Sequence, residues 1–433
     1  MHMGRKSGAR ILPISTPSPP VPLDERTAST TVKLPTEYSP LHMPMNLTRD
    51  EAQLFHHFIR HLGRWLDCTN AARIFTLVVS EKARTCPILV NAVLCFAARH
   101  RREDVVAEAA YERCVALLIN RLNESPASYD EMLLAAVLLL HFADQLITPS
   151  RTCPRDKHHL KGTSSILRAS MSAPFADPSA TSLRDAAFWL YVRQSLYNAT
   201  INQESLDIDF SLQLSPTPDC MRDTHSLAWL RIETAWANQM LWITACVANF
   251  CFSGFKAQYP QSETVRKEAQ WQELWDRNQA WRNSRPHVFD PIGSGPADDG
   301  HVFPDIWFTA DWHVLSYVFH HFSCILLLRY KPDSRFPIRW VPHKLSVSDC
   351  KILQHARAIC SACKSSMQNV QLLIVLCHTV FIWGPLLPNP AERQEVIRML
   401  RVFEETHSWR TEWIVDALRM EWGIASNGGP ERE

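Results

Sequence analysis

Residues 183–200 carry apolar side chains on nearly all of their helical surface. One apolar stripe recurs at the spacing of a helix, and Phe188, Trp189, Val192 and Leu196 fill much of the opposite face. A helix that is apolar nearly all round belongs inside a large core. We therefore expect other helices to surround this segment.

The rest of the chain also follows helical periodicity. Residues 158–170 end before a loop with two prolines, so this segment and 183–200 are predicted to form a helix pair. The other predicted helices cover residues 49–62, 71–79, 86–98, 104–123, 129–147, 228–252, 263–283, 306–330, 346–370, 371–383 and 391–423. In the 104–123 segment, the residues expected to face the core are Val105, Ala109, Val115, Leu118 and Leu122. Prolines and glycines make 283–303 the clearest loop.

The composition favours one large α-helical domain. The 433 residues are 46% hydrophobic and include only 12 glycines, which argues against a β-sandwich or a barrel. We predict an all-α bundle or array from residue 46 to 433. Residues 1–45 are rich in proline, serine and threonine, and are predicted to form a disordered or extended arm. The formal net charge of +1 gives no basic excess, so we expect no dominant DNA contact from this chain alone.

Several short blocks occur in a particular order along the chain. They are Cys86-Pro87 through Asn91-Ala92-Val93 to Ala97-Ala98-Arg99-His100; Asp156 with His159-Leu160 and Gly162; Ala186-Ala187-Phe188-Trp189 with Arg193-Gln194; Phe303-Pro304 with Trp307; and Trp422-Gly423. In this order they resemble the regulatory domain of fungal-specific transcription factors, which usually accompanies a Zn2Cys6 binuclear cluster. The resemblance covers about nine-tenths of the chain, once the N-terminal arm is set aside.

The cysteines do not fit the cluster itself. Six closely spaced thiolates are needed to hold two zinc ions, whereas this chain starts with Cys68 and continues sparsely. The one C-x-x-C pair, Cys360 and Cys363, is predicted to be structural, and most of the thirteen cysteines are predicted to be reduced core residues. Two explanations remain open. The chain acts through a dimer partner or as a modulator, or an upstream zinc-cluster exon is missing from the gene model.

Other familiar sites are incomplete. His57 and His61 lie four residues apart but lack the glutamate of a zinc protease helix, so we predict no metal site and no cofactor. Gly293-Ser294-Gly295 begins like a dinucleotide fingerprint and then lacks the third glycine. The charge-free stretches 235–255 and 365–391 contain polar residues or proline, so buried helices are preferred over membrane spans.

A few residues remain as candidates for ligand binding. Arg193 lies on the central helix, near Asp156 and His159, and a buried arginine requires partners. It either belongs to an ion-pair or helix-capping network with these two residues, or it anchors a small anionic effector. Four tryptophans either line an apolar pocket or fill the core; they are Trp189, Trp236, Trp242 and Trp307.

The resemblance implies a function in gene regulation. We expect a nuclear transcriptional regulator, not an enzyme, that controls a metabolic or secondary-metabolite gene set. The implied role of the helical domain is to sense a small-molecule effector or to self-associate, as a homodimer or as a heterodimer with a DNA-binding regulator. The alternatives are a helical enzyme that acts on a small apolar metabolite and a scaffold that binds no ligand.

Overall fold

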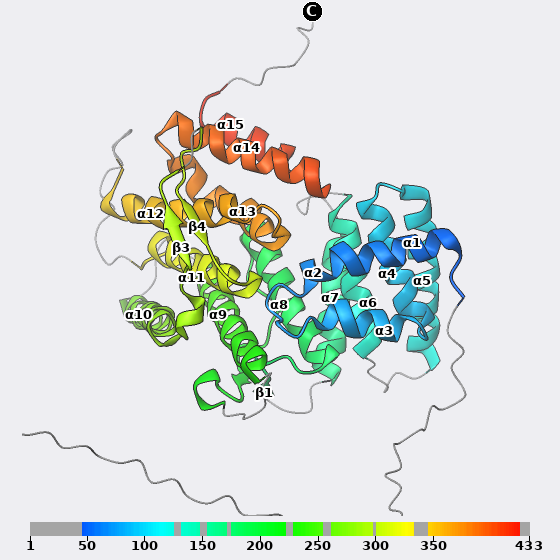
Figure 1. Cartoon of the computed structure of the whole chain (residues 1–433). Coiled ribbons are helices and arrows are strands. Elements are labelled where there is room, and N and C mark those ends of the chain that lie inside the picture. Colours follow the sequence, from blue (N-terminus) through cyan, green and yellow to red (C-terminus); the bar gives the residue numbers. More distant parts are fainter. Residues whose placement is uncertain are drawn as a thin grey trace, which may run out of the picture. The chain divides into compact units, whose positions relative to one another are not determined.

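Helices account for most of the described structure, which confirms the all-α prediction (Figure 1). In this computed structural model, the described residues are 46–124, 131–147, 154–170, 175–221, 228–253, 261–297, 300–332 and 345–424. They belong to one unit, Pro44–Glu433. The arm predicted for residues 1–45 lies outside the described residues, so its boundary stays a prediction.

The first group of helices forms the part coloured blue to cyan in Figure 1. Its elements are α1 (Arg49–His57), the π-helical turn η1 (Phe58–Leu62), α2 (Gly63–Leu66), a second π-helical turn η2 (Phe75–Val79), α3 (Ser80–Ala83), α4 (Pro87–His100), α5 (Asp104–Glu124), α6 (Glu131–Gln145) and α7 (Pro154–Ser170). Helix α4 packs against α1, α5 and α6, and α6 packs against α7.

Helix α8 (Leu183–Asn202) is the long buried helix that the sequence predicts. It packs against α6 and α7 from the first group and against α9 and α13 from the second, and Figure 1 shows it between the two groups. Phe188 and Trp189 are both buried, as expected for a helix that is apolar nearly all round. Ser182 is the N-cap of the helix, and its hydroxyl accepts the N–H of Asp185 and so satisfies one of the free amides of the first turn.

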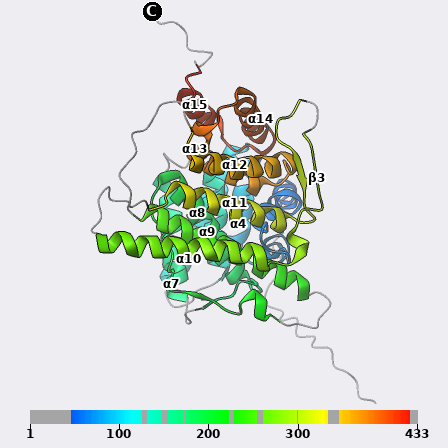
Figure 2. The ribbon, with the colours of Figure 1, turned by 90° about the vertical axis from the view of Figure 1, so that its left-hand side faces the viewer.

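The second group runs from green to red in Figure 1. Its helices are α9 (Ala228–Phe252), α10 (Gln261–Ser284), α11 (Asp311–Arg329), α12 (Val347–Ser365), α13 (Val370–Trp383), α14 (Pro390–His407) and α15 (Glu412–Glu421). Helix α11 packs against α9, α10, α12 and α13. Figure 2 shows α10 lying across α9 and α11.

Two short strand pairs accompany the helices. Strand β1 (Phe175–Ala176) pairs in parallel with β2 (Gln213–Leu214), and β3 (Gly293–Gly295) pairs antiparallel with β4 (Asp305–Trp307). The glycine-containing segment that begins like a dinucleotide fingerprint is therefore a hairpin strand. The helix predicted from residue 306 begins later, at Asp311, because Ile306 and Trp307 form backbone pairs with β3.

The face predicted for α5 is only partly right. Leu118 is buried and Val115 packs against the core, as predicted, but Val105 is 86% exposed, Leu122 is 47% exposed and Ala109 is also exposed. The buried stripe consists of Ala107, Ala110, Cys114 and Leu118. These buried residues also follow helical spacing. Three of them are small, which allows α5 to pack closely on α4 and leaves the larger aliphatic side chains outside.

The last predicted helix is divided. It consists of α14 and α15, separated by a turn in which Ser408 adopts a φ of 58°. The Glu404 carboxylate accepts the N–H groups of Thr411 and Glu412, so it caps the start of α15. No glycine or proline marks this break, and the apolar periodicity continues across it.

Two absences can be stated for the described part of the chain. None of its helices combines the length and the apolar character of a membrane-spanning helix. No three histidine, cysteine, aspartate or glutamate side chains in it come together as a metal site. His57 Nε2 instead lies 3.0 Å from His100 Nδ1.

Buried histidines make the stability of the chain sensitive to acid. Burial lowers the pKa of His141 and of His378 from 6.5 to about 3. Because the unfolded chain binds these protons more tightly, the stability from each neutral histidine is present above pH 6.5 and is lost as the pH falls towards 3. We expect the free energy of unfolding to fall by about 1.4 kcal/mol per pH unit for each such histidine.

Urea unfolding at several values between about pH 7 and about pH 4.5 measures this slope. His378 packs between the rings of Tyr197 and Phe322, so a leucine side chain should be accommodated there. His378→Leu should therefore reduce the dependence of the unfolding free energy on pH by the contribution of one histidine. Replacing the exposed His56 with glutamine should leave the slope unchanged. An unchanged slope in His378→Leu would contradict the assignment.

Candidate functional site

Two facing helices place three of the tryptophans of this chain around one pocket. On α9, Trp236, Gln239 and Trp242 follow one another at steps of three residues and so share one side of the helix. On α10, Arg277 and Trp281 are four residues apart and face α9. The indole N–H of Trp281 donates to the Trp236 carbonyl at 3.0 Å, which ties the two helices together.

The pocket between them has a volume of about 490 Å³. We call it the tryptophan pocket; it is lined by Phe210, Ser211, Leu212, Gln213, Leu214, Thr217, Asp219, Trp236, Gln239, Trp242, Ile243, Cys246, Arg277, Ala280, Trp281 and Ser284. Ligand pockets commonly measure about 300–1,000 Å³. The size therefore fits a small organic molecule.

The segment 210–219 supplies the third side of the pocket. It is held in place by β2, which pairs with β1 ahead of α8, and by the N–H of Ser215, which donates to the Ala176 carbonyl at 3.1 Å. The ring of Phe210 lies 5.4 Å from that of Trp242, measured between centroids. One wall of the pocket thus comes from a loop that is anchored near the start of the central helix.

The pocket floor is aromatic and well buried. Trp236, Trp242 and Trp281 are each no more than 5% exposed. Trp236 and Trp281 meet edge to face, with centroids 6.5 Å apart. Aromatic rings favour such edge contacts and offset stacking, so a flat ligand would find matching surfaces here.

One polar group of the floor lacks a partner. The side-chain oxygen of Gln239 is buried and has no hydrogen-bond partner among the described residues. A buried polar group without a partner costs about 1–3 kcal/mol, so a ligand that donates a hydrogen bond to this oxygen would gain affinity.

The charged residues of the pocket lie at its rim. Arg277 and Asp219 are both exposed, and within the described residues no carboxylate forms an ion pair with Arg277. Burial raises the pKa of the Cys246 thiol to about 11, although nearby Arg277 acts in the opposite direction. The thiol is therefore protonated near neutral pH and is a poor nucleophile. The arrangement suits binding better than covalent chemistry.

The candidate tryptophans from the sequence do not all line the pocket. Trp236 and Trp242 line the pocket, whereas Trp189 lies behind Trp242 at a centroid distance of 6.1 Å. The indole N–H of Trp189 donates to the Asp177 carbonyl at 2.8 Å. Trp307 is 46% exposed on β4 and does not line this pocket.

Arg193 lies elsewhere, between α8 and the turn after α2. Its guanidinium donates to the Thr69 hydroxyl at 2.7 Å and to the Leu66 carbonyl at 2.5 Å, so it caps the end of α2. Asp67 is close by; burial raises its pKa to about 6, against the opposing effect of three hydrogen bonds and of Arg193. Arg193 does not line the tryptophan pocket.

His159 lies on α7 and makes a separate set of contacts. Its Nε2 lies 3.2 Å from the Asp144 carboxylate and 3.3 Å from the Tyr111 hydroxyl. Asp156 is also on α7, but its side chain lies outside the described residues. Arg193 and His159 therefore take part in different contacts, one at the end of α2 and one between α6 and α7.

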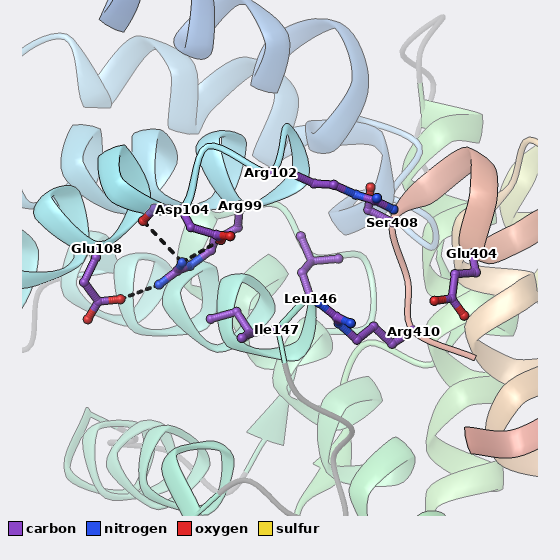
Figure 3. Close-up of a pocket in the computed structure, with 9 residues that line it drawn as sticks. All are labelled: Arg99, Arg102, Asp104, Glu108, Leu146, Ile147, Glu404, Ser408 and Arg410. Atoms are coloured by element: carbon purple, nitrogen blue, oxygen red, sulfur yellow. Dashed lines mark hydrogen bonds and ion pairs between the residues drawn. The ribbon is translucent and has the colours of Figure 1, made fainter. Parts of the chain in front are cut away.

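A second pocket, of about 460 Å³, lies where the α4–α5 turn, the end of α6 and the α14–α15 turn meet (Figure 3). Its charges are largely engaged within the chain. Arg99 lies between Asp104 and Glu108 and forms ion pairs with both, while Glu404 caps α15. Its apolar lining consists of Leu146 and Ile147, and it has no aromatic side chain. The tryptophan pocket is the better site for an organic ligand.

Sequence reasoning missed Gln239, Arg277 and the 210–219 segment. The signal for Gln239 is present, because it is the polar residue within an otherwise aromatic stripe of α9. The other two have no such signal. Only the packing of α10 and of the strand pair β1–β2 brings them to α9.

The chain is similar to a fungal regulator among curated proteins. It is 23% identical over 355 aligned residues to transcription activator AMTR1 of Alternaria alternata, an alignment that covers 69% of this chain and 45% of the activator. The chain thus spans less than half the length of that relative. No family model matches the sequence, and no solved structure matches it. The likeness supports a transcriptional regulator.

Proposed function

We propose that this chain is the regulatory part of a transcription factor of the fungal-specific type. It acts in the nucleus and controls a metabolic or secondary-metabolite gene set. A small effector occupies the tryptophan pocket, and the chain passes the signal to a homodimeric or heterodimeric partner that contacts DNA.

One observation carries the proposal. A chain that is similar to a transcription activator contains a preformed aromatic pocket with an unsatisfied polar group, the Gln239 oxygen. Apolar pockets with a few convergent polar groups are the usual sites for small molecules. The net charge of +1 also supports a sensing role in preference to direct phosphate contact.

The surroundings of the pocket suggest how a bound effector would act. Helix α9 packs against α11 and against α8, and α8 contacts both groups of helices. An effector shifts an equilibrium only by its difference in affinity for two states. An effector that binds best when α9, α10 and the 210–219 segment are close together would favour that packed state, and with it one form of the partner-binding surface.

The enzyme alternative has less support. The titratable residues that line the pocket are Asp219, Cys246 and Arg277, and two of them are exposed at the rim. The Cys246 thiol is the most buried of the three, and its raised pKa keeps it protonated. General acid–base catalysis most often uses histidine, and no histidine is among the described residues that line the pocket.

Chromatin immunoprecipitation of the tagged chain tests the proposal in the organism that carries the gene. We expect the chain at a defined set of promoters and altered transcripts of the adjoining genes when the chain is deleted. Ala280 is exposed on α10 at the pocket, so Ala280→Trp should fill the pocket without disturbing the core and should change these transcripts. Ala269→Trp, at an exposed position of the same helix outside the pocket, is the matched control.

Two results would overturn the proposal. The first is absence of the chain from promoters. The second is exclusion from the nucleus together with turnover of a metabolite by the purified chain, which would favour the enzyme alternative. Unaltered transcripts in Ala280→Trp would remove the pocket from the mechanism while leaving a regulatory role.

A further inference from the structure

The shape of the tryptophan pocket restricts the body of its ligand. Trp236, Trp242 and Trp281 form the floor and Phe210 lies beside Trp242, so aromatic side chains from three chain segments line the cavity. Aromatic pairs gain about 0.5–1.5 kcal/mol beyond the burial of their area. A flat conjugated ring system can make such contacts, whereas a flexible alkyl chain of equal area cannot.

The charge at the rim restricts the head group. Arg277 has no carboxylate partner among the described residues, and a guanidinium binds a carboxylate through two parallel hydrogen bonds. A guanidinium without a carboxylate partner among the described residues matches the shape and charge of one carboxylate, so the rim favours a ligand with a carboxylate head group.

A third polar contact lies between these two regions. The buried end of the Gln239 amide lies on the α9 stripe, three residues from both Trp236 and Trp242. Since an amide can turn over, this end can meet either an acceptor or a donor on the ligand. A polar atom on the ring system would satisfy it.

We infer that the tryptophan pocket binds a flat aromatic or conjugated carboxylic acid, with its ring system against Trp236, Trp242 and Trp281 and its carboxylate on Arg277. This inference rests on the proposed function in one respect, because it takes the molecule bound in the pocket to be the effector. It assigns to Arg277 the anchoring role that the sequence suggested for Arg193. The ligand class follows from the lining alone.

Titration calorimetry and quenching of tryptophan fluorescence test the inference with three probes on the full chain. 2-Naphthoate provides a flat ring with a carboxylate, 2-naphthamide has the same ring without the charge, and octanoate has the charge without the ring. We expect saturable binding of 2-naphthoate, at least about tenfold tighter than that of either other probe. Equal affinities for 2-naphthoate and 2-naphthamide would refute the carboxylate, and tighter binding of octanoate would refute the flat ring.

Variants of residues inside and outside the tryptophan pocket show whether the probe binds there. Arg277→Met should weaken 2-naphthoate about tenfold and leave 2-naphthamide unchanged, whereas Arg266→Met, at an exposed position on the same helix, should change neither affinity. Ala280→Trp should abolish binding of both naphthalene probes. Because Arg277, Arg266 and Ala280 are exposed, their variants should fold normally, which circular dichroism confirms.

The two proposals fail separately. Absence of saturable 2-naphthoate binding by the folded chain, or binding that Ala280→Trp and Arg277→Met leave unchanged, overturns the ligand class even if the chain occupies promoters. Binding as expected, by a chain that occupies no promoter, supports the ligand class and refutes the regulatory function.

Discussion

Replacing Asp305 with alanine is expected to lower the free energy of unfolding by about 3–5 kcal/mol. Asp305 begins β4, and its carboxylate lies 2.9 Å from the ammonium group of Lys364 near the end of α12. Both side chains are only 7% exposed. Removing the carboxylate leaves a buried ammonium group that still donates to the Phe303 carbonyl at 3.1 Å, and a buried charge without a counter-ion is strongly destabilising.

Urea denaturation of the wild type, of Asp305→Ala and of a double variant measures this effect. The double variant, Asp305→Leu with Lys364→Met, removes both charges and should unfold within about 1–2 kcal/mol of the wild type, because a buried ion pair is often replaceable by apolar groups. A loss below about 1 kcal/mol in Asp305→Ala would show that water reaches Lys364. The β3–β4 hairpin would then be held mainly by its backbone pairs.

Replacing Trp189 with alanine is expected to cost about 3–5 kcal/mol of stability, through the loss of a large buried side chain and the cavity that it leaves. Trp189 is 1% exposed and packs edge to face against Phe188 and Trp242. Its indole N–H also donates a hydrogen bond to the Asp177 carbonyl. Since Trp242 lines the tryptophan pocket, the cavity would open directly behind the pocket wall.

Two further variants identify the cause. Trp189→Phe keeps most of the apolar volume and should cost about 1–3 kcal/mol, chiefly because the Asp177 carbonyl loses its donor. Trp229→Ala, at a position 49% exposed on α9, should change stability by less than about 0.5 kcal/mol. Denaturant midpoints and slopes for the three variants give the comparison. Equal losses for Trp189→Ala and Trp229→Ala would contradict the central position of α8.

The candidate site was only partly predictable from the sequence. For Trp236 and Trp242 the sequence left a pocket and the core as alternatives, and their spacing on one helix places them on the same side as Gln239. For Arg193 it left a structural network with Asp156 and His159 and an effector anchor as alternatives. Arg193 instead donates hydrogen bonds to Thr69 and to the Leu66 carbonyl at the end of α2.

Partners from distant parts of the chain explain this difference. Arg193 and Leu66 are separated by 127 residues, and periodicity carries no information about which distant carbonyl will meet a buried cation. The same holds for Arg277, which belongs to a mostly polar helix and gains its place in the pocket only through the packing of α10 on α9. Sequence patterns identify residues that need partners but leave the partners unspecified.

The sequence by itself determined the helical class and the buried central helix, because an apolar surface that extends around a helix can be buried only among other helices. It also determined where several helices begin, through local caps such as Ser182. The tertiary structure decided which face of α5 is buried, where α14 ends and which arginine meets the tryptophans. These depend on close packing and on hydrogen bonds between residues far apart in the chain, which no local pattern encodes.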